Sequence, residues 1–254
     1  MIRRVVFNQK GGVGKTTIVC NLAAIAASRG LRTLVIDLDT QGNATQYLLG
    51  GKPGKADRTV GDFFESTLGF SLQPPPFVTY ATNTPFDNLD IVASDTRLED
   101  LQVKLESKQK VQKLRQALDK LRGYDAVFID TPPALNFYSR SALIAANRCL
   151  IPFDCDEFAR QALYTLLDNV QEIRADHNEE LEIEGIVVNQ FQNRAKLPAR
   201  VVAELREEGQ PVLEQTLSSS VRMKESHERH LPMIHLDPGH RLTLEYVTLF
   251  DALD

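Results

Sequence analysis

The chain has 254 residues, 43% hydrophobic and 25% charged, which are the proportions of an ordinary globular protein and exclude a disordered or fibrous one. Its formal net charge of -5 excludes a global positive field, so any contact with nucleic acid must come from a local basic cluster. The three cysteines form no CxxC pair, which argues against a disulfide framework or a zinc site and favours a reducing cytosol.

Strand-like and helical segments alternate along the chain. Near-continuous apolar runs predict strands at 3–8, 32–39, 89–94, 124–130, 148–153, 183–191 and 211–215. Helical periodicity and breaker residues predict helices at 15–29, 59–67, 96–121, 137–147, 157–175, 198–208 and 240–253. The breaker-rich part at 50–88 is the least regular, and we expect surface excursions around its short helix.

This alternation predicts an α/β fold in one domain, residues 1–254, with a doubly wound, mostly parallel sheet flanked by helices. No apolar run approaches the length of about 18 residues that a bilayer span needs, and the first apolar run is too short for a signal peptide. Ligands of such sheets bind beyond the carboxyl ends of the strands, and polar residues that suggest chemistry follow three of the predicted strands.

The first of these strand ends carries "NQKGGVGKTT", residues 8–17. Gly14, Lys15 and Thr16 match the end of the G-x-x-x-x-G-K-[ST] phosphate loop, although Gln9 stands at the position of its first glycine. Glycines let the loop turn its N–H groups toward phosphates, and the following helix adds its positive N-terminus. The expected nucleotide-binding residues are Gly11, Gly12, Val13, Gly14, Lys15, Thr16 and Thr17.

Within this loop we expect Lys15 to reach the β- and γ-phosphates of ATP and the Thr16 hydroxyl to bind Mg²⁺. Carboxylates complete such a site, and Asp37, Asp39 and Asp130 end two other strands. The predicted metal-site residues are therefore Thr16, Asp37 and Asp130. Asp39 is expected to orient water or accept a proton, with helix capping as the alternative.

Four segments, "KGGVGKTT", "DLDTQGNAT", "IDTPP" and "IPFDCDEFARQAL", occur in this order. Together they closely resemble the ParA/MinD family of P-loop ATPases with a deviant Walker-A motif, best the small, Soj-like ParA partition ATPases, over residues 2 to about 247. The resemblance implies a P-loop NTPase fold, hydrolysis of ATP with Mg²⁺, and a homodimer in the ATP-bound state.

The resemblance also implies roles for single residues. Lys10 would be the signature lysine that reaches the partner's phosphates, and Asp39 would support hydrolysis, so the catalytic set is Lys10, Lys15 and Asp39. Asn189, at the end of "GIVVN", would hydrogen-bond adenine. The alternatives are a solvated loop lysine at position 10 and a simple turn residue at position 189.

The resemblance to ParA also implies what the ATP-bound dimer does. It would bind DNA without sequence preference, and a ParB-like or cargo-adaptor protein would stimulate hydrolysis. The protein would be cytoplasmic and associated with the nucleoid. Phosphate binding needs clustered basic residues. The candidates are Arg194, Lys196 and Arg200 in one group and Arg222, Lys224 and Arg229 in another. Glu225 and Glu228 weaken the second group, and both groups could be ordinary solvated helix faces.

Two other function classes are kept open. A MinD-like regulator binds membrane through a basic amphipathic C-terminal helix, whereas "RLTLEYVTLFDALD" has one basic and three acidic residues and is expected to pack on the domain. A P-loop ligase or a metallochaperone of the nitrogenase-reductase type is the second class. Cys20, Cys149 and Cys155 are poorly placed to bridge a cluster, and a ligase substrate pocket cannot be recognised from sequence.

Overall fold

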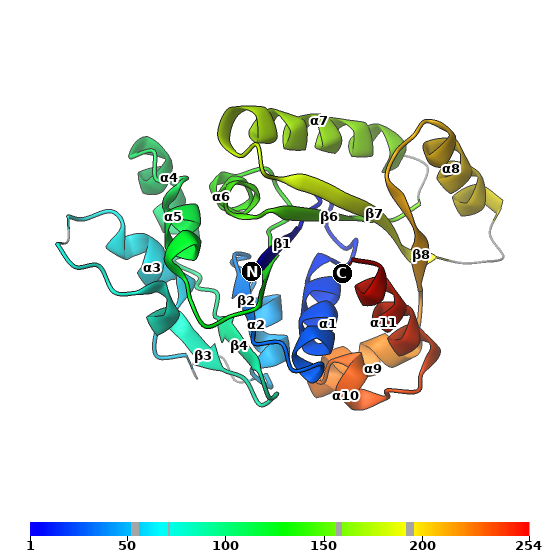
Figure 1. Ribbon diagram of the computed structural model, residues 1–254, viewed down its shortest axis with the longest axis horizontal. Helices are drawn as coiled ribbons and strands as arrows, with labels where there is room; N and C mark the ends of the chain where they lie inside the picture. The colour runs from blue at the N-terminus through cyan, green and yellow to red at the C-terminus, as the bar shows by residue number, and fades with distance from the viewer. Residues whose placement is uncertain (52–55, 71, 156–158, 192–195, 254) are drawn as a thin grey trace.

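An eight-stranded sheet lies between two layers of helices in the computed structural model, which describes residues 1–51, 56–70, 72–155, 159–191 and 196–253 (Figure 1). The strands are β1 (Ile2–Val6), β2 (Thr33–Asp37), β3 (Ala81–Asn83), β4 (Leu89–Val92), β5 (Ala126–Asp130), β6 (Arg148–Phe153), β7 (Glu182–Phe191) and β8 (Val212–Ser218). The helices are α1 (Lys15–Ser28), α2 (Asn43–Leu48), α3 (Val60–Ser66), η1 (Phe77–Tyr80), α4 (Leu98–Ser107), α5 (Lys113–Lys120), α6 (Phe137–Ala145), α7 (Ala159–His177), α8 (Lys196–Glu207), α9 (Val221–Arg229), α10 (Met233–Leu236) and α11 (Arg241–Leu253).

The strand order is β3-β4-β2-β5-β1-β6-β7-β8, and every neighbouring pair is parallel except β3 with β4. The predicted doubly wound, mostly parallel sheet is therefore confirmed. Strand β1 lies at the centre between β5 and β6, so the loop that follows β1 emerges in the middle of the carboxyl edge. This is where a doubly wound sheet places its ligand.

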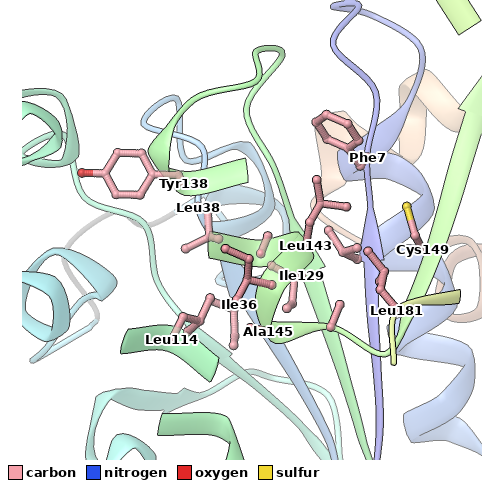
Figure 2. Close-up of a cluster of buried hydrophobic side chains, with 14 of the residues drawn as sticks. Phe7, Ile36, Leu38, Leu114, Ile129, Tyr138, Leu143, Ala145, Cys149 and Leu181 are labelled. Carbon is pink, nitrogen blue, oxygen red and sulfur yellow. The ribbon is translucent and has the colours of Figure 1, made fainter. Parts of the chain in front are cut away.

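Each face of the sheet has its own hydrophobic core. One core packs α1, α2, α10 and α11 against the sheet, and the other packs α3 to α8 against the opposite face. Figure 2 shows part of the second core, where Ile36, Ile129 and Leu143 come from two strands and a helix. Because both faces are covered, the central strands are apolar on both sides, as their sequences predicted.

The single helix predicted at 96–121 is wrong, because the chain forms two helices, α4 and α5, there. Leu105 and Leu114 both enter the same core, yet nine residues make about two and a half helical turns and would point them in opposite directions. A break with Gln109 in the left-handed region, at φ 50°, turns the second leucine back to the core.

The part at 50–88 contains more buried structure than the expected surface excursions. The predicted short helix is present as α3, with a capping box between Thr59 and Asp62. Phe63 and Phe77 also pack edge to face at 4.8 Å inside the core. Residues 52–55 and 71 lie outside the described part of the chain. Within the described residues, no helix has both the length and the apolar character that a membrane span requires.

Candidate functional site

The loop between β1 and α1 curls tightly at the carboxyl edge of the sheet. Gly12 and Gly14 have φ values of 77° and 88°, in the left-handed region that favours glycine. A Cβ atom on Gly14 would also lie 2.2 Å from the Asn189 amide nitrogen. The backbone conformation therefore favours glycine at position 14, and any larger residue there would also displace the Asn189 side chain.

Lys15, the first residue of α1, points into this loop and is 7% exposed. Its Nζ atom donates a hydrogen bond to the Lys10 carbonyl oxygen at 3.0 Å. Burial lowers the pKa of Lys15, whereas the nearby carboxyl groups of Asp130 and Asp39 act to raise it. The loop thus holds a desolvated ammonium group beside acidic residues, as expected for a lysine that binds phosphate.

Two carboxyl groups face each other at the ends of neighbouring strands. Asp37 of β2 and Asp130 of β5 are partners in the sheet register, and both are fully buried. Asp37 accepts hydrogen bonds from the Thr45 amide at 2.8 Å and the Thr45 hydroxyl at 2.7 Å. Burial raises the pKa of Asp37 to about 6, although these bonds act against the shift. Burial and the neighbouring Asp37 also raise the pKa of Asp130.

Asp130 is incompletely satisfied. Its Oδ1 atom accepts a bond from the Thr131 amide at 3.1 Å, whereas its buried Oδ2 atom has no hydrogen-bond partner. A buried carboxylate oxygen without a partner is costly and fits a site that a cation or its water shell occupies. The Thr16 side chain also hydrogen-bonds Asp130, so two of the predicted metal-site residues lie together.

These residues fit magnesium shared with a nucleotide better than a metal cage made of protein alone. Among the residues that the structure describes, no three acidic, histidine or cysteine side chains gather closely enough to hold a metal ion. Mg²⁺ commonly takes one or two protein ligands and completes its shell with waters and phosphate oxygens. Thr16 and Asp130 would supply the protein part of such a shell, and Asp37 lies behind them.

Asp39 follows β2, lines a cavity together with Lys15 and Thr16, and is 7% exposed. Its Oδ1 atom accepts a hydrogen bond from the Gln41 amide at 3.0 Å. Ser94 donates to the Asp39 carbonyl oxygen at 2.5 Å and so ties this loop to the end of β4. The carboxylate is therefore positioned by its own loop and also reaches the cavity.

Lys10 lies on the outer side of the phosphate loop. Its ammonium group is 3.7 Å from the carboxylate of Asp154, which follows β6, and both side chains are 38% exposed. An exposed ion pair of this length is weak and exchanges readily with water. Sequence reasoning did not single out Asp154, although it follows the predicted strand 148–153 and strand-end position was the signal used for Asp37, Asp39 and Asp130.

Asn189, expected to contact adenine, instead donates a hydrogen bond to the Val13 carbonyl oxygen at 2.9 Å in this structure. Its neighbour Gln190 donates to the Gly12 carbonyl oxygen at 3.2 Å. Both side chains hold the phosphate loop against the end of β7. The contact with adenine stays a prediction.

A cavity of about 480 Å³ joins the loop to more distant elements. Its lining includes Gly11, Gly12, Gly14, Lys15, Thr16, Thr17 and Asp39, and also Gln41, Asn43, Gln46, Tyr47, Pro133, His227 and His230. The second group was missed by the sequence analysis. The two histidines come from α9 and its end, and nothing in their local sequence distinguishes them from surface residues.

The described basic residues considered for DNA lie on two separate helices, α8 and α9. Arg194 lies outside the described residues, as does the side chain of Lys196. Arg200 on α8 pairs with Glu204, whereas Arg222 on α9 pairs with Glu225 and Asp237. Helices α8 and α9 lie over opposite faces of the sheet in Figure 1. Lys224 and Arg229 are exposed on α9.

The C-terminal helix considered for membrane binding and two of the cysteines considered for a metal cluster pack inside the protein. Helix α11 buries Leu242, Leu249 and Phe250 in the core beside α1, so its main apolar face already packs on the domain. Cys20 and Cys149 are fully buried and cannot bridge a cluster at the surface.

Comparison with known proteins points to one family. Residues 3–183 match the AAA_31 family, described as an AAA domain. The chromosome-partitioning ATPase Soj of Thermus thermophilus is 35% identical over 227 residues, which cover 89% of this chain and 84% of that protein.

Solved structures agree with this comparison. The cobyrinic acid a,c-diamide synthase of Mycobacterium smegmatis, with bound ADP and magnesium, is similar with a TM-score of 0.76 at 26% identity over 91% of each chain. The ATP complex of a McdA variant from Cyanothece has a TM-score of 0.86 at 23% identity and covers 100% of this chain and 96% of that chain, which shows a shared fold.

Proposed function

We propose, from the premise that the chain belongs to the ParA/MinD family of P-loop ATPases, that the protein is a dimerising ATP switch that positions or segregates cargo. The observation that carries this proposal is a cavity lined by Lys15 and Thr16, next to which Asp130 is buried with an unpartnered carboxylate oxygen. These groups suit the phosphates and the metal of a magnesium nucleotide.

In this proposal the loop amides and Lys15 hold the phosphates, and Thr16 and Asp130 hold Mg²⁺, with Asp37 behind them. When bound between Thr16 and Asp130, the metal would supply charge neutralisation to the phosphate oxygens. Asp39 orients the attacking water or accepts its proton, because it lies at the cavity edge with its carboxylate fixed by the Gln41 amide.

Lys10 links the nucleotide to dimerisation. Two protomers that meet through their cavities would bring two sets of phosphates together, and a cation supplied by each to the other offsets that repulsion. Lys10 can do this after leaving Asp154, because the ion pair between them is long and exposed. The dimer thereby depends on the γ-phosphate.

The output we propose is ATP-dependent binding to DNA without sequence preference, with hydrolysis stimulated by a ParB-like or cargo-adaptor protein. The relative from Thermus named as a chromosome-partitioning ATPase supports this direction. Arg222, Lys224 and Arg229 on α9 are the preferred contacts, since they share one described helix. Helix α8 lies over the opposite face of the sheet from α9, so its basic residues would contribute only if the dimer places both helices against the DNA.

The test is co-sedimentation of the Asp39→Ala protein with non-specific duplex DNA. Asp39→Ala should accumulate the ATP-bound dimer, so we expect binding with Mg-ATP and none with Mg-ADP. Binding should weaken steeply as salt rises, because phosphate contacts release counterions. Adding Arg222→Ala should weaken binding and lower the slope of log K against log salt by about 1.

The matched control adds Lys15→Ala to Asp39→Ala and should abolish DNA binding by removing nucleotide binding. Vesicles of anionic lipid under the same conditions test the MinD-like alternative. An Asp39→Ala protein that is dimeric with ATP yet does not bind DNA at low salt would refute the proposed DNA binding.

A further inference from the structure

His227 reaches the phosphate loop from the far end of the chain. Its Nε2 atom lies 3.1 Å from the Thr17 hydroxyl, across 210 residues of sequence. Thr17 is in the first turn of α1, directly after the residues that we assign to the terminal phosphates and the metal. The imidazole is exposed and lines the same cavity as the loop glycines.

The ring is held in place by α2 as well as by α1. Tyr47 packs its buried ring against the His227 ring, edge to face, with centroids 5.2 Å apart. The Tyr47 hydroxyl hydrogen-bonds with Ser226 and donates to the Leu231 carbonyl oxygen at 3.2 Å. The end of α9 is therefore fixed to α2 by contacts that do not involve the imidazole nitrogens.

His230, the residue directly after α9, also lines the cavity. Its backbone is left-handed, at φ 53°, and its ring lies so close to Gly51 that a Cβ there would be 2.4 Å from its Nε2 atom. This second imidazole closes the wall beside His227 and leaves the mouth of the cavity lined by two possible donors to anionic oxygens.

The order of residues along α1 indicates which part of a nucleotide meets His227. If Lys15 and Thr16 serve the β- and γ-phosphates and Mg²⁺, Thr17 is left beside the α-phosphate and the ribose. A nucleotide oxygen there would lie within reach of both the Thr17 hydroxyl and the His227 ring, since these two are already 3.1 Å apart.

We propose that His227 is a nucleotide-contacting residue, whose Nε2–H exchanges the Thr17 hydroxyl for an oxygen on the α-phosphate side of the nucleotide while Tyr47 holds the ring. Helix α9 thereby becomes a wall of the nucleotide site. This inference rests on one part of the proposed function, namely that the protein binds a nucleotide. It involves neither DNA nor the dimer.

The experiment is calorimetric titration of Mg-ADP and of a magnesium complex of a non-hydrolysable ATP analogue into the wild-type protein, His227→Ala and His227→Gln. Loss of one hydrogen bond to a charged group should weaken both ligands about tenfold in His227→Ala. His227→Gln should recover most of the affinity, because its amide nitrogen can occupy the place of Nε2. His177→Ala, a histidine at the end of α7 outside the cavity, should match wild type.

Thermal unfolding without nucleotide separates binding from folding. His227→Ala should melt with the wild-type protein, because Tyr47 keeps α9 in place. Unchanged affinity in His227→Ala would overturn the inference, and so would a loss that His227→Gln does not restore. A wild-type protein that binds Mg-ADP but never DNA would refute the proposed DNA binding alone, whereas one that binds no nucleotide would refute both proposals.

Discussion

Asp37 and Asp130 are two carboxyl groups whose ionised forms are destabilised by burial and would be stabilised by a bound cation. Their carboxyl groups are buried side by side in the register of β2 and β5, and the pKa of each is raised. A buried carboxylate without a cation is costly, whereas Mg²⁺ would reverse the balance. We therefore expect these two carboxyl groups to lower the free energy of unfolding of the nucleotide-free protein.

The pH dependence of unfolding tests this expectation at Asp37. Its folded pKa of about 6 exceeds the ordinary 3.8, so the folded state binds the proton more tightly. Stability from this group is full below about pH 4 and is lost as pH rises to about 6, by roughly 3 kcal/mol. Urea unfolding between pH 4 and 7 should show a flatter or more positive slope for Asp37→Asn than for wild type.

The difference in slope carries this test, because Asp37→Asn also disturbs the bonds from Thr45 and shifts the stability at every pH. Asp251→Asn is the control, since that exposed carboxylate pairs with Arg29 and its pKa is lowered rather than raised. Parallel curves for wild type and Asp37→Asn would contradict the raised pKa.

At the scale of elements, α9 is a short polar helix that depends on its neighbours for its position. Ser226 is its buried side chain, and it meets the Tyr47 hydroxyl of α2. The cap residue Ser220 accepts a bond from the Arg222 amide and starts the helix. The docking of α9 therefore depends on a few polar contacts and little apolar area.

Tyr47→Phe should loosen α9 specifically. Removing the buried hydroxyl takes away one of the two partners of the Ser226 hydroxyl, which keeps its bond to the Leu231 carbonyl oxygen, and should lower the free energy of unfolding by about 1 kcal/mol. Amide hydrogen exchange should accelerate in α9 more than in α11, which is held by apolar packing. Tyr164→Phe is the matched control and should cost less than about 0.5 kcal/mol, because the Tyr164 hydroxyl bonds with Arg160 of α7 and with Glu208, which follows α8, at the surface. Equal exchange in both helices would show that α9 does not depend on Tyr47.

At the scale of the whole molecule, the carboxyl edge of the sheet is the face on which the proposed dimer must form. The phosphate loop, Asp39 and Lys10 are all at this edge, and a partner would approach them directly. In the proposed dimer, nucleotide binding and dimerisation are separable, because the proposal has Lys15 act within a protomer and Lys10 between protomers.

Lys10→Ala should separate the two steps. We expect nucleotide affinity within about threefold of wild type, since Lys15 contacts the backbone carbonyl of Lys10, which alanine keeps, and no ATP-dependent dimer. Light scattering coupled to size exclusion, with the Asp39→Ala background to prevent turnover, measures the dimer. Lys104→Ala, an exposed lysine on α4, is the control and should dimerise normally. Dimerisation of Lys10→Ala with ATP would exclude the proposed contact between protomers.

Local patterns in the sequence determined most of the layer architecture. Apolar runs and helical periodicity depend on neighbouring residues, so they predicted the parallel sheet, the loop at 8–17 and the strand ends that carry Asp37 and Asp130. They failed at 96–121, where the break between α4 and α5 exists because two leucines must face one core. They also gave no sign of α9 as part of a ligand cavity.

Only the tertiary structure decided which distant residues meet. The sheet order sets Asp37 opposite Asp130, and the return of the chain after β8 brings His227 to Thr17. Such contacts join residues separated by up to 210 positions, and their side chains carry no mark of a partner in the surrounding sequence. The sequence by itself therefore determined the phosphate loop and its strand-end carboxylates, because those are local chemistry. The fold decided the wall of the cavity, because only tertiary contacts bring α2 and α9 together.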